Sequence, residues 1–244
     1  MYKYDVKYSL VIPCYNESEN LPVLVDRCSL LLKNRKDIEV LLIDNGSTDN
    51  THIVLKSLLK NIGKKNLRSM RIDINKGYGF GIISGLKECH GEVIGWTHAD
   101  LQTDPMDFIN AISFFEKIKD SGKVFVKGSR KNRSFKDVIF TWGMSLFEWL
   151  ILGTYMHDIN AQPTVFTRNF FASLGNLPKD FSLDLFIFNE AVNNSYKIQR
   201  FPVIFELRLK GKGHNETFLS KLKYSYKTIL FSIGLRQHLK NLSK

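Results

Sequence analysis

The stretch IEVLLIDNGSTD, residues 38–49, decides the fold class of this chain. It opens with a nearly continuous apolar run of strand length, and such a run predicts a strand in a parallel sheet that is covered on both faces. The run ends at Asp44, and a turn at Gly46 leads into a helix predicted to open near Ser47 or Thr48. An acidic residue at the carboxyl end of a strand, before a turn and a helix, can hold a nucleoside.

The same alternation of strand-length and helix-length segments extends to both sides of this stretch. Strands are predicted at residues 8–13, 38–44, 67–74, 92–96 and 123–126, and helices at about 19–33, from 47 or 48, at 78–89 and from 105. In the less regular second half, strands predicted at 161–167 and 197–209 flank a helix at 183–194. We therefore expect an α/β fold with a mostly parallel central sheet flanked by helices. Its Rossmann-like first half would bind ligands at the carboxyl ends of the strands.

The composition of the 244 residues is that of an ordinary globular protein, with 43% hydrophobic and 24% charged residues. The chain is long enough to bury a core without a disulfide or a metal, and its three cysteines include no C-x-x-C pair that would indicate a zinc site. The net charge of +11 points to an anionic partner: nucleic acid, anionic lipid or a phosphorylated small molecule. We expect one large domain over residues 1–215 and a basic helical appendage over residues 216–244.

Two features bear on the membrane. The apolar segment 138–156 carries Glu148 at its centre, so we predict a buried or interface-lying helix rather than a spanning one. Basic residues, which anionic lipid attracts, crowd two segments: Lys127, Arg130, Lys131, Arg133 and Lys136, then Lys210, Lys212, Lys221, Lys223 and Lys227. Residues 221–240 either lie in the interface as an amphipathic helix or form the solvated face of a docked helix. Because no secretory signal opens the chain, we expect a cytoplasmic protein, peripheral at the cytoplasmic face of the membrane.

The first predicted strand leads into the sequence VIPCYNE, residues 11–17. Pro13 cannot donate to the sheet, and the strand is predicted to end there. Tyr15 can stack on a base, and Glu17 can accept hydrogen bonds from a base or a ribose. The alternative is a plain strand-to-helix turn with Asn16 or Ser18 as the N-cap.

The next two strand ends allow similar interpretations. Ser47 or Thr48 can cap the second helix, with Asp49 favourable in its first turn, and this capping is compatible with a nucleoside on Asp44. The sequence NKGYGFG at residues 75–81 follows the third strand, and its alternate glycines would let the backbone approach a ligand closely. Its spacing matches neither a P-loop nor G-x-G-x-x-G.

The end of the fourth predicted strand, WTHADLQTDP at residues 96–105, is the most informative motif. On an extended chain His98, Asp100 and Gln102 point to the same side. Imidazole, carboxylate and amide oxygen suit a divalent cation, Mn²⁺ or Mg²⁺, that keeps open positions for phosphate, and the imidazole favours Mn²⁺. The alternative is a loop that caps the following helix, with Asp104 as the N-cap.

Taken together, P-x-Y-N-E, I-D-N-G-S-T-D, N-x-G-x-G and H-A-D-L-Q resemble the motifs of the inverting family 2 glycosyltransferases, which have the A-type glycosyltransferase fold. A-D-L-Q followed by a proline, with G-S-R at residues 128–130, is most similar to the polyprenyl-phosphate (dolichyl-phosphate) mannose and glucose synthases. The resemblance covers about residues 8–210. It implies transfer of a sugar from a nucleotide-sugar to a polyprenyl phosphate or a surface-glycan intermediate at the membrane.

The resemblance also implies roles for individual residues. Those that would hold the nucleotide-sugar donor are Pro13, Tyr15, Glu17, Asp44, Asn75, Gly77, Asp100 and Lys212. Asp100 and Gln102 would sit at the cation that bridges the diphosphate. Arg130 would face the donor or acceptor phosphate, and Arg208 would close over the diphosphate with the loop at 211–214.

Three positions depart from the family pattern. His98 stands in place of the first aspartate of D-x-D, and Asn45 in place of the second aspartate of D-D-G-S. The sequence N-A-Q-P at residues 160–163 stands in place of a glycine–phenylalanine pair. The change at His98 bears on binding of the cation, and the change at residues 160–163 bears on the identity of the acceptor.

Charge develops on the departing diphosphate, and a divalent cation with Arg130 and Arg208 would neutralise it. Attack from the opposite face inverts the anomeric carbon. A phosphate acceptor needs no base, whereas a sugar hydroxyl needs one. Asp184 is then the candidate catalytic base; otherwise it is a carboxylate stabilised at a helix N-terminus. The alternatives are a nucleotide-sugar-binding pseudoenzyme and a nucleic-acid-binding protein, but the sequence has no nucleic-acid recognition motif, so we expect no nucleic-acid partner.

Overall fold

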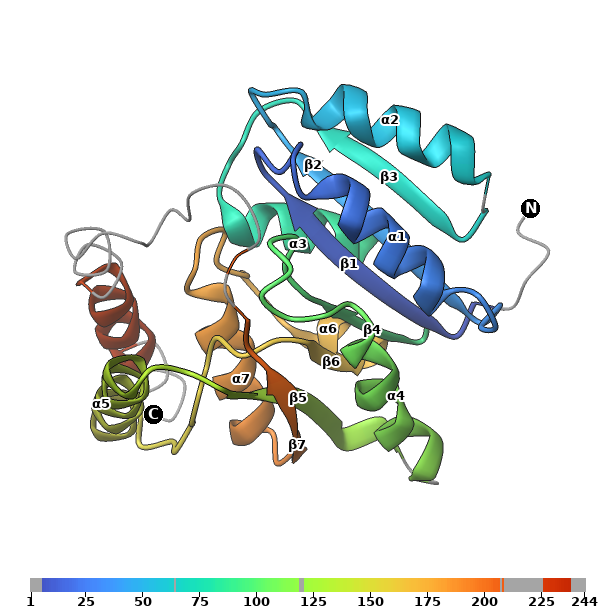
Figure 1. Cartoon of the computed structure of the whole chain (residues 1–244). Helices are drawn as coiled ribbons and strands as arrows, with labels where there is room; N and C mark the ends of the chain where they lie inside the picture. Colours follow the sequence, from blue (N-terminus) through green and yellow to red (C-terminus); the bar gives the residue numbers. More distant parts are fainter. Residues whose placement is uncertain (1–5, 64, 119–120, 207, 209–225, 238–244) are drawn as a thin grey trace.

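One seven-stranded sheet organises the chain, in the order β3-β2-β1-β4-β6-β5-β7 (Figure 1). The computed structural model describes residues 6–63, 65–118, 121–206, 208 and 226–237. The strands are β1 (Tyr8–Cys14), β2 (Ile38–Asn45), β3 (Leu67–Ile72), β4 (Val93–Trp96), β5 (Val124–Lys131), β6 (Thr164–Thr167) and β7 (Lys197–Ile204). The helices are α1 (Leu21–Leu31), α2 (Thr51–Ile62), α3 (Tyr78–Glu88), α4 (Asp107–Lys117), α5 (Phe135–Leu152), α6 (Arg168–Ser173) and α7 (Leu183–Asn193). Residues 226–237 are also helical.

The sheet is mostly parallel, as the sequence predicts. β1 pairs in parallel with β2 and β4, β2 with β3, and β5 with β7. Among the strands that the structure describes, β6 alone runs against its neighbours, β4 and β5. The carboxyl ends of the other six strands therefore meet at one edge of the sheet. β1 continues one residue beyond Pro13, because its pairing with β4 has already ended at Val11.

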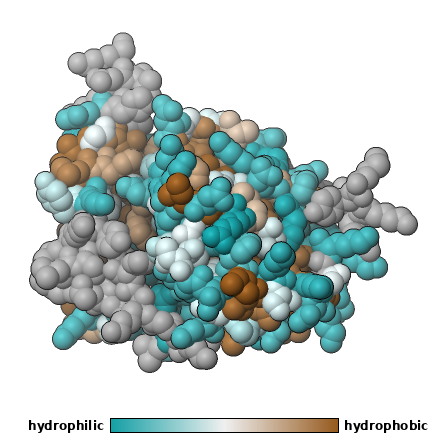
Figure 2. Space-filling view, turned by 90° about the horizontal axis from the view of Figure 1, so that it is seen from above, coloured by the Kyte–Doolittle hydropathy of each residue, from teal (hydrophilic) through white to brown (hydrophobic). Residues whose placement is uncertain are grey.

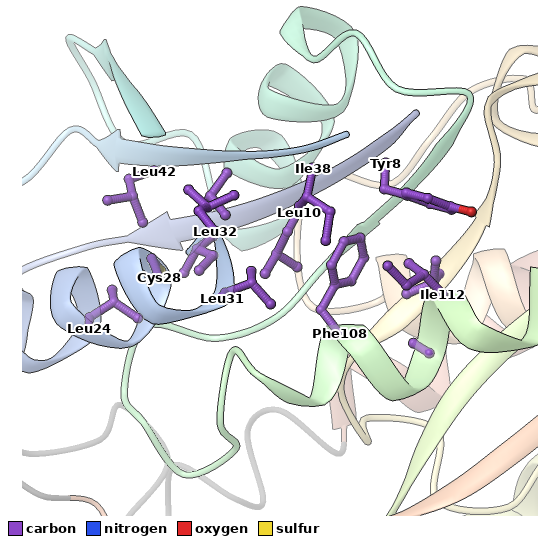
Figure 3. Packing of buried hydrophobic residues seen from close by; sticks show 14 of the residues in the cluster. Tyr8, Leu10, Leu24, Cys28, Leu31, Leu32, Ile38, Leu42, Phe108 and Ile112 are labelled. Atoms are coloured by element: carbon purple, nitrogen blue, oxygen red, sulfur yellow. The ribbon is translucent and has the colours of Figure 1, made fainter. Parts of the chain in front are cut away.

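Cores on both faces of the sheet explain why the strands are apolar without alternation. Successive residues of β1 point to opposite faces, so Leu10 joins one core and Val11 the other. Figure 3 shows the first core, in which Leu24 and Cys28 of α1 lie with Phe108 of α4. The second core lies against α3, α6 and α7.

Two helices begin later than predicted, because the candidate capping residues bond across loops instead. The residues that precede α1 and α2 are Asn20 and Asn50. The Oγ of Ser47 accepts from the backbone N–H of Asn16 at 3.1 Å, and Oδ1 of Asn16 accepts from the N–H of Thr48 at 2.9 Å. These bonds fasten the loop after β1 to the loop after β2, so the predicted caps Asn16, Ser47 and Thr48 are wrong.

The acidic candidates also lie outside their helices, and so does Ser18. The N–H of Ser18 donates to Asp49 Oδ2 at 3.3 Å, and Asp49 Oδ1 accepts from the N–H of Thr51, the first residue of α2, at 2.9 Å. Asp104 lies three residues before α4 begins, and its Oδ1 accepts from the N–H of Met106 at 2.9 Å. Both aspartates thus precede their helix, and each accepts from a backbone N–H at or just before the first helical residue.

The helix α5 carries its apolar residues outward. Its buried residues are Ser145 and Glu148, whereas its large apolar side chains are 40–78% exposed: Phe135, Val138, Ile139, Phe140, Trp142, Leu146, Trp149 and Leu150. The prediction of a buried helix is therefore wrong, and an interface-lying helix is the alternative that remains. Among the described residues, no helix combines the length and the apolar character that crossing a bilayer requires.

The helix at 226–237 lies beside α5. Ser232 Oγ donates to Glu148 Oε1 at 2.9 Å, and both helices lie on the left of Figure 1, away from β1, β2 and β3. In Figure 2 most of the visible face is hydrophilic, and hydrophobic residues gather towards the same side. The loop predicted at 211–214 and most of the predicted appendage, with Lys210, Lys212, Lys221 and Lys223, lie outside the described residues.

Candidate functional site

The carboxyl end of β2 presents a buried carboxylate, and one of its oxygens accepts no hydrogen bond from the described residues. Asp44 is 1% exposed, and its Oδ1 accepts from the N–H of Ser47 at 3.0 Å. Its Oδ2 has no hydrogen-bond partner among the described residues. Arg71 Nη1 lies 3.6 Å from Oδ2, and the ring nitrogen Nδ1 of His52 lies 3.7 Å from it. A buried acceptor of this kind suits a hydrogen-bond donor from a ligand, such as a ribose hydroxyl.

The carboxyl ends of β1 and β4 are joined by the segment that follows β7. Glu17 accepts from Asn20 Nδ2 at 2.6 Å and from Arg208 Nη2, and Arg208 Nη1 lies 4.0 Å from Asp100 Oδ2. Burial raises the pKa of Glu17, and the bonds from Asn20 and Arg208 offset only part of that rise. The structure thus brings together three predicted site residues, Glu17, Asp100 and Arg208, from segments far apart in the chain.

The glycines after β3 lie close to other parts of the chain. A Cβ on Gly77 would collide with the backbone oxygen of Lys179, and one on Gly79 would lie 2.6 Å from that of Pro178. Gly77 also has a φ of +116°, which favours glycine, and its N–H donates to Asn75 Oδ1 at 2.8 Å. Gly77 and Gly79 therefore pack against the segment before α7, and Asn75 closes the loop. Donor binding by Asn75 and Gly77 stays a prediction.

A polar network connects the end of β4 to the start of α7. The hydroxyl of Tyr78 lies 2.9 Å from His98 Nε2 and 3.1 Å from Asp184 Oδ2. Asp184 is 3% exposed, and its Oδ1 accepts from Lys127 Nζ at 3.2 Å and Gln162 Nε2 at 2.8 Å. Burial lowers the pKa of Lys127 to about 8, although the Asp184 carboxylate opposes the shift.

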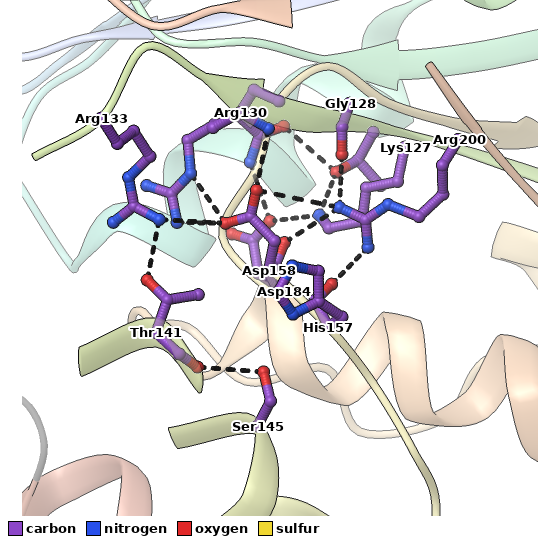
Figure 4. A network of polar contacts seen from close by, with 12 residues as sticks. Lys127, Gly128, Arg130, Arg133, Thr141, Ser145, His157, Asp158, Asp184 and Arg200 are labelled. Carbon is purple, nitrogen blue, oxygen red and sulfur yellow. Dashed lines mark hydrogen bonds and ion pairs between the residues drawn. The ribbon is translucent and has the colours of Figure 1, made fainter. Parts of the chain in front are cut away.

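Three arginines surround a second carboxylate, Asp158 (Figure 4). The backbone N–H and the guanidinium of Arg130 both donate to it, with the N–H at 2.9 Å and Nε at 2.8 Å. Arg133 Nη1 and Arg200 Nη2 lie 3.7 Å and 3.9 Å from its oxygens. Burial would raise the pKa of Asp158, but Arg130 and then Arg133 outweigh it and hold the pKa below its usual range. The arginines exceed the carboxylate that they contact by two charges, which suits an added anion.

Three members of the basic cluster at 127–136, which we expected anionic lipid to attract, are largely buried. Lys127 is fully buried in β5, and Arg130 and Arg133 are only 13% and 11% exposed. Lys131 and Lys136 remain exposed. The sequence analysis missed which side chains pair. It gave no signal for the contacts of Tyr78 and Asp158 or for the contact between Lys127 and Asp184, because these residues lie far from their partners in the chain.

Of the three predicted cation ligands, His98, Asp100 and Gln102, the structure leaves the first two as the donors that fit a divalent cation. Leu101 has a φ of +60°, which breaks the extended chain that the prediction assumed. Gln102 Nε2 donates to the backbone oxygen of Glu206 at 3.2 Å, so this side chain holds the segment after β7. The described residues contain no group of three His, Cys, Asp or Glu side chains that could hold a metal. His98 and Asp100 supply a nitrogen and a carboxylate, a donor pair that fits a cation whose other ligands are diphosphate oxygens and water.

Comparison with known sequences agrees with the family that the strand-end motifs resemble. The family model described as "Glycosyl transferase family 2" matches residues 9–180. A dolichyl-phosphate beta-glucosyltransferase of Dictyostelium discoideum is 27% identical over an alignment of 179 residues, which covers 67% of this chain and 55% of that protein. An undecaprenyl-phosphate 4-deoxy-4-formamido-L-arabinose transferase of Yersinia enterocolitica is 33% identical over 112 residues, 46% of this chain and 34% of that protein. The chain thus spans about half, or less, of the length of these curated relatives.

Solved structures share the fold. Glucosyl-3-phosphoglycerate synthase from Mycobacterium tuberculosis, in complex with Mn²⁺, UDP and glucosyl-3-phosphoglycerate, superposes with a TM-score of 0.72 at 15% identity, covering 95% of this chain and 80% of that one. A mannosyltransferase from Pyrobaculum calidifontis with GDP-Man and Mn²⁺ gives a TM-score of 0.65 at 18% identity, covering 94% and 69%. The predicted A-type glycosyltransferase fold is confirmed.

Proposed function

The chain belongs to glycosyl transferase family 2, and from that premise we propose that it transfers a sugar from a nucleotide-sugar to a polyprenyl phosphate at a membrane surface, with inversion at the anomeric carbon. The observation that carries the proposal is the row of buried or half-buried carboxylates at the carboxyl edge of the parallel strands: Asp44, Glu17 and Asp100. The names of the relatives, which are polyprenyl-phosphate sugar transferases, support the acceptor class.

The donor would lie along this edge. Asp44 Oδ2 is the buried acceptor that a nucleoside hydroxyl would satisfy, with Tyr15 and Glu17 beside it on the chain that leaves β1. His98 and Asp100 would hold the cation, with Mn²⁺ favoured by the imidazole and present in the structural neighbours. That cation supplies positive charge to the leaving diphosphate. Arg208, between Glu17 and Asp100, adds a second positive charge on the same edge. Lys212, also expected there, lies outside the described residues.

The surroundings of Asp184 favour a phosphate acceptor over a sugar hydroxyl. Both of its oxygens already accept hydrogen bonds, and Lys127 pairs with it in a buried setting. A carboxylate occupied in this way is poorly placed to take a proton from a hydroxyl. A phosphate needs no base, and the charge excess of Arg130, Arg133 and Arg200 would balance its charge.

The helix α5 supports peripheral attachment to a membrane. Its exposed apolar stripe includes Trp142, Leu146, Trp149 and Leu150, at helical spacing on one side. Such a face fits the boundary between headgroups and acyl chains, where tryptophan is favoured. With a net charge of +11, the chain should co-sediment with anionic vesicles and less so at high salt.

Donor binding is tested by calorimetry with a panel of UDP-, GDP- and dTDP-sugars. Asp44→Asn keeps an acceptor for the N–H of Ser47 but removes the charge, so it should weaken donor binding by about 1–3 kcal/mol. The matched control is Asp26→Asn on the exposed side of α1, which removes the same charge away from the edge. A folded Asp44→Asn protein that binds the donor as tightly as the control does would refute the proposed donor site.

A further inference from the structure

Tyr78 stands between the donor side and the acceptor side of the proposed site. It is the first residue of α3, and its hydroxyl lies within hydrogen-bond distance of His98, after β4, and of Asp184, in the first turn of α7. Its ring stacks on Phe181 with centroids 4.6 Å apart and meets the His98 ring edge-on at 5.7 Å. One side chain therefore contacts three segments that converge here.

The directions of the two hydrogen bonds follow from the number of protons. A hydroxyl carries one proton and two lone pairs. Lys127 and Gln162 donate to Oδ1 of Asp184, and the hydroxyl of Tyr78 donates its proton to Oδ2. The bond to His98 must then use a lone pair of Tyr78, and His98 Nε2 must carry the hydrogen. In a neutral ring this leaves the lone pair of His98 on Nδ1.

We propose that Tyr78 is a positioning residue that fixes the tautomer and the ring plane of His98, leaves Nδ1 as the nitrogen that binds the cation, and ties this donor-side ring to the acceptor-side Asp184. The inference deepens the proposed function and rests on it. Histidines that bind metals commonly donate their other ring N–H to a fixed acceptor, and the loss of that acceptor lowers metal affinity about 10–100-fold. Here a tyrosine, itself held by Asp184, takes that place.

The test compares Tyr78→Phe with Phe181→Leu. Tyr78→Phe removes the hydroxyl and keeps the ring on Phe181, whereas Phe181→Leu disturbs the stack and keeps the hydroxyl. The first readout is the ¹⁵N spectrum of the histidine side chains in the ligand-free protein, with the signals of His98 assigned by comparison with His98→Gln. The second is the affinity for Mn²⁺, titrated by electron paramagnetic resonance with UDP and separately with GDP.

Wild type and Phe181→Leu should both show His98 with its proton on Nε2. Tyr78→Phe should mix the two tautomers and bind Mn²⁺ at least about 10-fold more weakly at an unchanged melting temperature. Three results would overturn the inference: a proton on Nδ1 in wild type, a Tyr78→Phe protein that matches wild type in both readouts, or a wild type that binds no Mn²⁺ with either nucleotide. None of them touches donor binding through Asp44, which calorimetry measures separately.

Discussion

The helices α1 and α5 are both rich in apolar residues, but α1 buries these side chains whereas α5 exposes them. In α1 the buried residues are apolar and follow helical spacing: Leu21, Leu24, Val25, Cys28 and Leu31. In α5 the buried residues are Ser145 and Glu148, and the apolar stripe faces outward. An apolar segment in the sequence therefore does not reveal which partner its apolar face meets. For α1 the partner is the sheet, and for α5 we propose a lipid surface.

The same substitution on both helices should separate these roles. Leu24→Ala removes a fully buried side chain from the first core and should lower the free energy of unfolding by about 2–5 kcal/mol. Leu150→Ala removes a side chain that is 64% exposed and should change it by less than about 0.5 kcal/mol. Urea unfolding of both variants measures the difference. Equal losses would mean that the outward face of α5 is part of the folded core.

The inward carboxyl of α5 should make stability depend on pH. Burial raises the pKa of Glu148 to about 7, with the hydrogen bond from Ser232 opposing the shift. The folded chain then holds this proton more tightly than the unfolded chain does. The stability of the folded chain that comes from this proton is therefore complete below the ordinary pKa of glutamate. It is lost as the pH rises through about 7.

Glu148→Gln should remove this loss, which amounts to about 3 kcal/mol for a shift of this size. The variant should therefore be more stable than wild type at pH 8, and its advantage should disappear near pH 4.5. Chemical unfolding at several pH values measures the trend, with the exposed Glu19→Gln as the control. If the difference in stability between Glu148→Gln and wild type were constant across this range, Glu148 would not be buried as the structure places it.

The sequence predicts the sheet well because burial on both faces leaves a direct signal, a continuous apolar run. It also predicts that Asp44, Glu17 and Asp100 share one edge, since parallel strands end together. It cannot predict which side chains pair across the chain. Capping motifs at Ser47 and Thr48 turned out to fasten two loops together, because a loop partner satisfied the same atoms that a helix end would.

The glycines at 75–81 also show that the sequence does not identify contact partners. Glycine indicates that something approaches closely, but the sequence does not say what does. In the structure the backbone at Pro178 and Lys179 approaches Gly77 and Gly79, and the side chain of Asn45 approaches Gly81. The basic residues at 127–136 likewise suggested attraction to anionic lipid, whereas Lys127 is buried against Asp184. The direction in which α5 turns its apolar face also required the structure, since Glu148 alone left buried and interfacial helices open.

Transfer of labelled sugar to a lipid tests the central claim most directly. The chain is incubated with a nucleotide-sugar that it binds, Mn²⁺ and anionic vesicles that contain a polyprenyl phosphate, and labelled sugar is counted in the organic extract. We expect lipid-linked label that requires the polyprenyl phosphate, with the anomeric configuration inverted. Binding of the nucleotide-sugar without any transfer to the lipid, or transfer to a glycan hydroxyl in its place, would contradict it.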